Sequence, residues 1–358
     1  MNNQISISTE QSTSIDSTEP EPPDRLATSG SLTISEAQKH KLVKTEPAKL
    51  GSFFVGSRKL TVETFSSIEK CRELWRELAQ PKTLFDTWEF RYAFYLAYRF
   101  LPYFLVLKSA DENLALLPLW YDNEENKYVW FGSSWQEEVR FFSKDPELFP
   151  LLLSAAPAPL SLNAISIESV KAAGGLVKFQ ADESKYVLNI SGFSNHEDYL
   201  MTLKKSDRHS LRKDRRRIES QSSRIVVDEF ADFDQMVALA KKRFSGRGGA
   251  DWEDPRRIET FRQVIRLGGA SYKARMISIK IGEKTAGVDL ICLFNDTYFT
   301  VKCGYDVAEF PGIGNYMNLV EIDDAVRLGM KKIDFLQNNY TWKSRWFESI
   351  PLFKYEKK

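Results

Sequence analysis

Hydrophobic and polar positions alternate along the chain in segments that predict an α/β protein. A strand-like run at residues 60–65 precedes an amphipathic helix at 66–78 and a second helix at 87–100 that ends before a proline. Three short apolar runs, separated by the turn-forming segments DEN and DNEEN, then predict a meander of strands: residues 103–108, 114–120 and 127–132. A helix near residues 146–153 and a strand at 162–167 follow.

The second half of the chain repeats this order of elements. It begins with a strand at 185–190 and one long helix in which NHEDYLMTL runs into KKSDRHSLRKDRRRIE. The remaining predicted elements are a strand, two helices, a three-stranded meander, a helix ending at a glycine and a closing strand: residues 224–230, 232–244, 255–267, 271–281, 286–294, 297–305, 310–329 and 331–336. The repetition predicts two related lobes with mixed sheets, an α/β (α+β) fold.

Composition supports two lobes and adds a tail. The chain has 358 residues, of which 42% are hydrophobic and 28% charged, values typical of globular proteins with more than one core. Residues 1–50 are rich in Ser, Thr, Glu and Pro and contain no aromatic residue, so they predict a disordered tail. We therefore expect an N-terminal lobe at 51–184 and a C-terminal lobe at 185–358.

Charge and cysteine content exclude several classes of function. Lys and Arg total 50 against 49 Asp and Glu, so no overall charge draws the chain to DNA or to a membrane surface. The three cysteines and three histidines lack metal-ligand spacing, and no metal is expected. The N-terminus lacks a secretory signal and no apolar run approaches about 20 residues, which predicts a cytoplasmic protein.

Three segments between residues 199 and 346 carry a family resemblance. The basic helix YLMTLKKSDRHSLRKDRRRIE, the stretch GYDVAEFPGIGNYMNLVEIDDAVRLGMKKIDFL and the closing element WKSRW occur in the order found in Fem-like and CelD-like proteins. The chain therefore resembles the Fem-like branch of the acyl-CoA N-acyltransferase (GNAT) superfamily. The N-terminal lobe fits more loosely, through LFDTWEF, LLPLW and FGSSWQEE. The resemblance implies two GNAT-like lobes in tandem, with the C-terminal lobe the better match.

The resemblance also implies a reaction: an acyl group moves from a thioester or aminoacyl ester to an amine. Acyl-CoA would serve as a co-substrate, with no permanently bound cofactor. Its pyrophosphate would lie at a loop and helix start where glycines permit close approach and free amides bind phosphate: Gly312, Ile313, Gly314, Asn315 and Tyr316. The alternative is an ordinary Pro-Gly turn before a helix.

A dense run of cations provides a second candidate for phosphate binding. Residues 204–217 contain eight Lys or Arg, and Lys204, Arg208, Arg212 and Arg215 recur at steps of three and four, so they share one helical face. Such a row suits the phosphates of a nucleotide or of a tRNA acceptor end. A solvated charged face is the competing interpretation.

Five residues are candidates for the chemistry. Asp289 interrupts the most apolar predicted strand and either faces a cleft, where it could orient or deprotonate an amine, or pairs with a nearby cation such as Lys302. Tyr305, at the end of the next strand, could protonate the leaving thiolate, although aromatic packing competes. By resemblance, Asp334 shapes the cleft or caps a turn, and Lys343 contacts phosphate or developing charge. Glu137, in a loop after a strand, either meets a cationic acceptor or belongs to a solvated acidic loop.

The expected function is an N-acyltransferase that moves an acyl group from an acyl-CoA thioester to an amine, such as an amino sugar or a cell-envelope precursor. Two alternatives remain. One is an aminoacyl-tRNA-dependent transferase, favoured by the basic helix and WKSRW. The other is a non-catalytic two-lobed binding protein.

Overall fold

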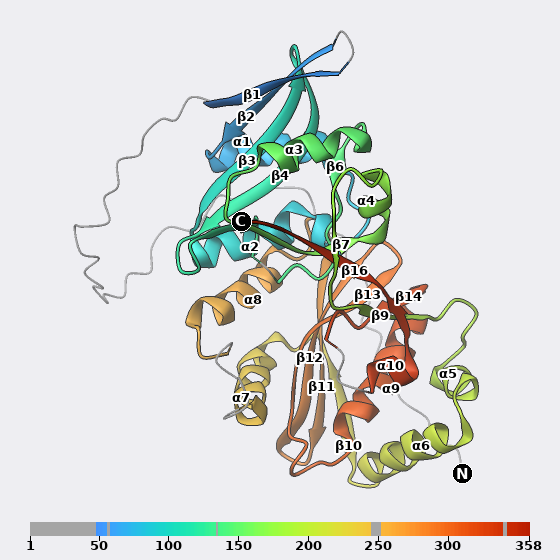
Figure 1. The fold of residues 1–358 in the computed structure, drawn as a ribbon. Helices are drawn as coiled ribbons and strands as arrows, with labels where there is room; N and C mark the ends of the chain where they lie inside the picture. Colours follow the sequence, from blue (N-terminus) through green and yellow to red (C-terminus); the bar gives the residue numbers. More distant parts are fainter. Residues whose placement is uncertain (1–47, 56–57, 134, 245–251, 339–341) are drawn as a thin grey trace, which may run out of the picture. The chain divides into compact units, whose positions relative to one another are not determined.

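The computed structural model describes residues 48–55, 58–133, 135–244, 252–338 and 342–358. Residues Thr45–Lys358 form one compact unit. The predicted tail, residues 1–50, lies outside the described residues except for its last three, which belong to a strand. Two mixed sheets organise the compact unit, each covered by helices (Figure 1).

The first sheet is built mainly from the first half of the chain. Its strand order is β1-β2-β3-β4-β5-β7-β16-β8, with β6 paired to β4. The bounds are β1 Ala48–Val55, β2 Arg58–Phe65, β3 Leu101–Ser109, β4 Glu112–Asp122, β5 Lys127–Trp130, β6 Phe142–Ser143, β7 Leu160–Ser166, β8 Gln180–Ala181 and β16 Leu352–Lys357. The pair β5–β7 is parallel, and the other pairs are antiparallel.

Four helices accompany this sheet: α1 Ile68–Leu78, α2 Trp88–Tyr98, α3 Phe149–Ala155 and α4 Ile167–Ala172. Helix α1 illustrates why the sequence is helical there. The Ser67 side chain caps its first turn by accepting from the Lys70 amide. Cys71, Leu74, Trp75 and Leu78 recur at helical spacing and are buried against the sheet.

The second sheet contains the C-terminal GNAT-like elements. Its order is β10-β11-β12-β13-β14-β9-β15. The bounds are β9 Lys185–Asn189, β10 Ser223–Val227, β11 Lys273–Ile281, β12 Lys284–Phe294, β13 Thr297–Tyr305, β14 Lys332–Asp334 and β15 Glu348–Ile350. The pair β13–β14 is parallel, and the other neighbours run antiparallel.

The helices of this half are α5 His196–Thr202, α6 Lys205–Glu219, α7 Phe233–Phe244, α8 Pro255–Leu267, α9 Ile313–Arg327 and α10 Lys343–Trp346. The single helix expected over residues 195–219 is wrong, because the chain breaks at Leu203 and Lys204, both extended. The Leu203 amide bonds to the carbonyl of Leu200, three residues back, and closes a tight turn. The Leu203 side chain then packs against the hydrophobic core of the second sheet, here called the second core, which includes Leu200, Leu211 and Ile218.

Two features join the two sheets. Helices α2 and α8, one from each half, pack on each other, and their aromatic side chains belong to one shared core. The last strand, β16, returns to the first sheet and inserts between β7 and β8. The strand of residues 352–357 therefore belongs to the sheet of the first lobe although it follows the second in sequence.

Candidate active site

The site begins where two parallel strands separate. Strand β13 pairs with β14 only from Thr297 to Phe299, whereas its pairing with β12 continues to Tyr305. Beyond Phe299, the edge of β13 that faces away from β12 has no strand partner among the described residues. Backbone amides on this edge are thus available to a bound molecule.

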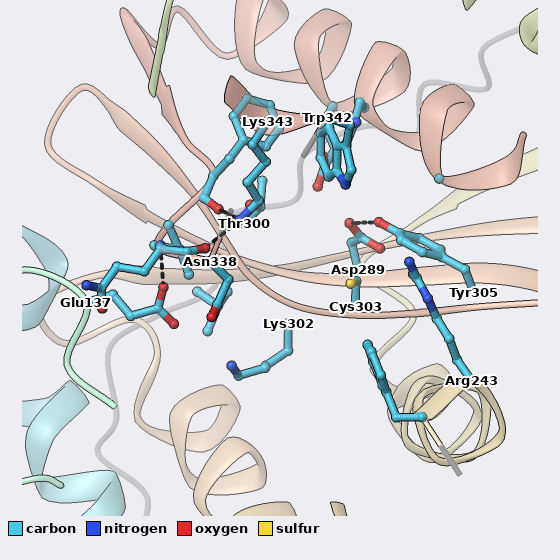
Figure 2. A pocket seen from close by; sticks show the side chains of 18 of the residues that line it. Glu137, Arg243, Asp289, Thr300, Lys302, Cys303, Tyr305, Asn338, Trp342 and Lys343 are labelled. Atoms are coloured by element: carbon cyan, nitrogen blue, oxygen red, sulfur yellow. Dashed lines mark hydrogen bonds between the residues drawn. The ribbon is translucent and has the colours of Figure 1, made fainter. Parts of the chain in front are cut away.

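A cavity of about 740 Å³ opens beside this free edge. A bulge at Val301, where the β12–β13 register shifts, brings four consecutive residues, 300–303, to its wall. Glu137 from the first half of the chain and Lys343 from α10 also line it (Figure 2). The cavity therefore collects side chains from segments that are far apart in sequence.

Asp289 and Tyr305 meet at this cavity, and a position facing a cleft was one of the two alternatives that the sequence left for Asp289. The Tyr305 hydroxyl donates to Oδ2 of Asp289 at 2.5 Å (Figure 2). The tyrosine ring is held between two glycines: a Cβ on Gly287 would lie 2.8 Å from the ring, and one on Gly314 would lie 3.4 Å from it. The sequence therefore keeps both positions small so that the Tyr305 ring can reach Asp289.

Glu321 on α9 adds a second buried carboxyl that the sequence-based prediction missed. Its side chain is 1% exposed and lines the same cavity as Asp289. Burial raises the pKa of Asp289 to about 7, and burial together with Asp289 raises the pKa of Glu321 well above its ordinary value. A signal was present: Glu321 follows Ile313 and Met317 at steps of four, on the buried face of α9.

Two cations also line the cavity, and neither was among the predicted site residues. Arg243 on α7 points toward Tyr305, with its guanidinium carbon 5.7 Å from the ring centre (Figure 2). Lys302 on β13 lies with its ammonium 4.3 Å from the ring centre of Trp135. Both come from ordinary charged positions in the sequence, so only the tertiary structure marks them as cavity residues.

Lys343 lines the cavity but also holds the backbone together. Its ammonium donates to the carbonyls of Phe335 at 2.5 Å and Gln337 at 2.7 Å. Burial lowers the pKa of Lys343 below its ordinary value. Glu137 accepts from the Gln337 amide at 2.8 Å, and burial raises its pKa. The two predicted residues therefore meet at one wall, around residues 335–337.

Asp334 does not line the cavity. It is fully buried, and its carboxylate accepts from Lys185 Nζ at 2.8 Å and from the Leu336 amide at 3.0 Å. Lys185 also donates to Glu138 at 2.5 Å. These contacts match the turn-capping alternative, and they tie β9, β14 and the loop after β5 together.

The start of α9 was predicted to bind a pyrophosphate, and only some of its residues face the cavity. Gly312, Gly314 and Asn315 line the cavity, whereas Ile313 and Tyr316 are buried in the second core. Gly312 adopts φ 92°, and a Cβ there would lie 2.7 Å from the carboxyl carbon of Asp214 on α6. Asn315 donates to the same carboxylate at 2.7 Å. A negative charge thus lies against the predicted phosphate site.

The cations of α6 lie apart from the cavity. Arg208, Arg212 and Arg215 line an open hollow of about 940 Å³ with Glu197 and Glu219, whereas Lys204 is not among its lining residues. Arg212 donates to Glu197 at 2.5 Å, and Arg215 donates to Glu219 at 2.8 Å. The predicted row therefore exists for three of its four residues, but acids neutralise part of its charge.

Two further observations concern metals and membranes. Among the described residues, no group of three or more His, Cys, Asp or Glu is placed to hold a metal ion. None of the helices that the structure describes combines the length and the hydrophobicity that crossing a bilayer requires.

Parallel strands that separate beside a cavity, with a helix starting at the same place, are consistent with the resemblance to GNAT acyltransferases. The family model of the acetyltransferase (GNAT) domain matches residues 205–344, which include α6, the meander β11–β13, α9 and β14. Residues 205–344 are thus similar in sequence to GNAT acetyltransferase domains. No curated protein matches the sequence significantly.

Solved structures extend the likeness over both lobes. FemX shares 10% identity with a TM-score of 0.52, covering 82% of this chain and 97% of its own. L-PGS from Bacillus licheniformis shares 11% identity with a TM-score of 0.53, covering 82% of this chain and 92% of its own. A conserved protein of unknown function from Bacteroides thetaiotaomicron shares 11% identity with a TM-score of 0.55, covering 82% of this chain and 99% of its own. These likenesses establish the tandem fold.

Proposed function

We propose that the protein transfers an acyl group from an activated carboxyl donor to an amine bound in the cavity beside β13. The observation that carries the proposal is the hydrogen bond from Tyr305 to Asp289 at the end of the free strand edge. An acid, a base and free amides are the three groups that amide formation from an ester or thioester requires.

The contacts support a balanced sequence of steps. The neutral amine nitrogen attacks the carbonyl carbon of the donor, and amides of the free β13 edge stabilise the oxyanion. Asp289, with its pKa near neutrality, takes one proton from that nitrogen as the new bond forms. The bond to the leaving sulfur or oxygen breaks. Tyr305 protonates the leaving atom and is reprotonated by Asp289 through their hydrogen bond.

The acceptor proposed from the sequence, an amino sugar or an envelope precursor, gains support from the aromatic rings of the cavity. Trp135, Trp252 and Trp342 all line it. Indole faces pack well against the apolar faces of sugar rings while nearby charges bind polar substituents.

Acyl-CoA is the donor that the sequence favoured. An aminoacyl ester of tRNA is a second candidate because Asp214 lies against the start of α9, where a pyrophosphate would be repelled. The name FemX and the name L-PGS belong to structures with the same fold and do not decide between the donors.

The test is amine-dependent release of the leaving group. Purified protein is incubated with acetyl-CoA and glucosamine or simple diamines, and free thiol is measured. Tyr305→Phe and Asp289→Asn should each lower turnover about 10²- to 10⁴-fold. Tyr128→Phe, on β5 in the first sheet, is the matched control and should retain activity.

Wild-type turnover in both Tyr305→Phe and Asp289→Asn would refute this site. Transfer from aminoacyl-tRNA without any thiol release from acetyl-CoA would select the second donor. Absence of transfer from either donor would leave the non-catalytic alternative.

A further inference from the structure

We propose that Asp289 and Glu321 form a carboxyl pair that holds one proton and binds the acceptor as a primary ammonium ion. The inference rests on the proposed function and narrows the acceptor to a cationic amine rather than an alcohol or thiol. It also makes Glu321 a second residue that contacts the reacting nitrogen.

The inference rests on buried carboxyl oxygens beside the cavity that lack hydrogen-bond donors. Asp289 Oδ1 and both carboxyl oxygens of Glu321 are buried, and apart from the hydrogen bond between the two side chains they accept none from the residues that the structure describes. Burying polar oxygens without a donor is costly, so such atoms commonly await a ligand. A primary ammonium has three N–H donors, and both side chains line the cavity that would admit it.

The charge of the pair follows from its surroundings. Two buried carboxylates in contact cannot both ionise at neutral pH, and one retains a proton. Two charged groups face the pair, Arg243 on α7 and Asp324 on α9. Three neutral groups of β13 also face it: Tyr298, Cys303 and Tyr305. Asp324 is paired with Arg275 at 2.7 Å. The pair therefore holds one negative charge above about pH 7, the pKa of Asp289.

This single charge accounts for binding, activation and release. The ammonium gives one proton to the pair, so both carboxyls are then neutral and the amine is free to attack. Tyr305 gives its proton to the leaving group and recovers one from Asp289, which leaves the pair with one proton. The nitrogen, now bonded to the acyl carbon, gives its second excess proton to the pair. The pair then passes one proton to water and again holds one. The amide product is neutral and is no longer attracted.

Binding of a simple amine tests the pair without any donor. Calorimetry should show that wild-type protein binds n-butylammonium more tightly than n-butanol, its neutral isostere, and that the affinity falls as the pH drops below about 7. In Glu321→Leu, Asp289 loses the Glu321 hydrogen bond that stabilises its ionised form, so this loss of affinity should move to a pH higher by roughly one unit or more. Glu348→Gln, an exposed residue on β15, should behave as wild type.

Several outcomes would overturn the inference: equal affinity for butanol and butylammonium, an unchanged pH dependence in Glu321→Leu, or Mg²⁺ displacing butylammonium from the site. If Glu321→Leu does not fold, infrared spectroscopy of the wild type decides. At pH 8 a protonated carboxylic acid should be visible and should shift when glutamate side chains carry ¹³C. Amine binding without acyl transfer would refute the proposed function alone, and transfer without the pH shift would refute this inference alone.

Discussion

Single residues at the start of α9 shape one wall of the cavity. Gly312 needs a positive φ and sits against the Asp214 carboxylate, while Gly314 leaves room for the Tyr305 ring. The glycines were recognisable in the sequence, and their proximity to a helix start was predicted. The carboxylate was not, since Asp214 lies about a hundred residues earlier, within a basic run.

Asp214→Asn should raise the affinity for coenzyme A about two- to fivefold, the effect of one charge at a helix start. The amide can still accept from Asn315, so the local contacts should survive. Calorimetry with coenzyme A measures the change, and Asp234→Asn on exposed α7 serves as the control. Unchanged or weaker binding would show that Asp214 does not exclude a pyrophosphate.

At the scale of elements, α6 is less basic than its sequence suggests. Arg212 and Arg215 share Glu197, and Arg215 also contacts His196 on α5 and Glu219. Arg208 donates to the Met201 sulfur at 3.4 Å and forms no salt bridge with the acids that the structure describes. Acids on α5 and on α6 itself therefore pair with Arg212 and Arg215, and Arg208 keeps more of its charge for a bound anion.

Arg208→Ala should therefore weaken binding of a tRNA-sized RNA and reduce the magnitude of its salt slope by about one. Arg212→Ala should weaken binding less, since its charge is already offset by Glu197. Filter binding between low and moderate salt measures both. Equal losses in the two variants, or none in either, would argue that the helix face is only solvated.

At the scale of the whole molecule, the C-terminal strand links the two halves. Deleting residues 351–358 removes β16, which lies between β7 and β8 and buries Leu352 at 1% exposure. The free energy of unfolding in urea should fall by at least about 1.5 kcal/mol, the burial of one leucine side chain. Deleting Lys358 alone should have little effect. Unfolding at the same urea concentration in both truncations would show that β16 is dispensable.

The local sequence determined most of the elements of this protein. Periodicity, caps and turn residues predicted α1, α2, α7, α8, α9 and the meander β11–β13, because those signals act within about a dozen residues. The resemblance to the GNAT superfamily, carried by the segments around α6, α9 and α10, is confirmed. Asp289 was also recognisable as a candidate, because a charge in an apolar strand needs a partner. Tyr305 was recognisable from its position at the end of the next strand.

The tertiary structure alone decided which of these residues meet. The pairing of Glu321 with Asp289, the position of Arg243 beside Tyr305 and the return of β16 to the first sheet all join distant segments. Asp334 and Lys343 bind Lys185 and backbone carbonyls for the same reason. The type of a residue determines which groups it can hydrogen-bond to. Only the packing of the whole chain brings one of those groups within hydrogen-bonding distance and buries the pair together.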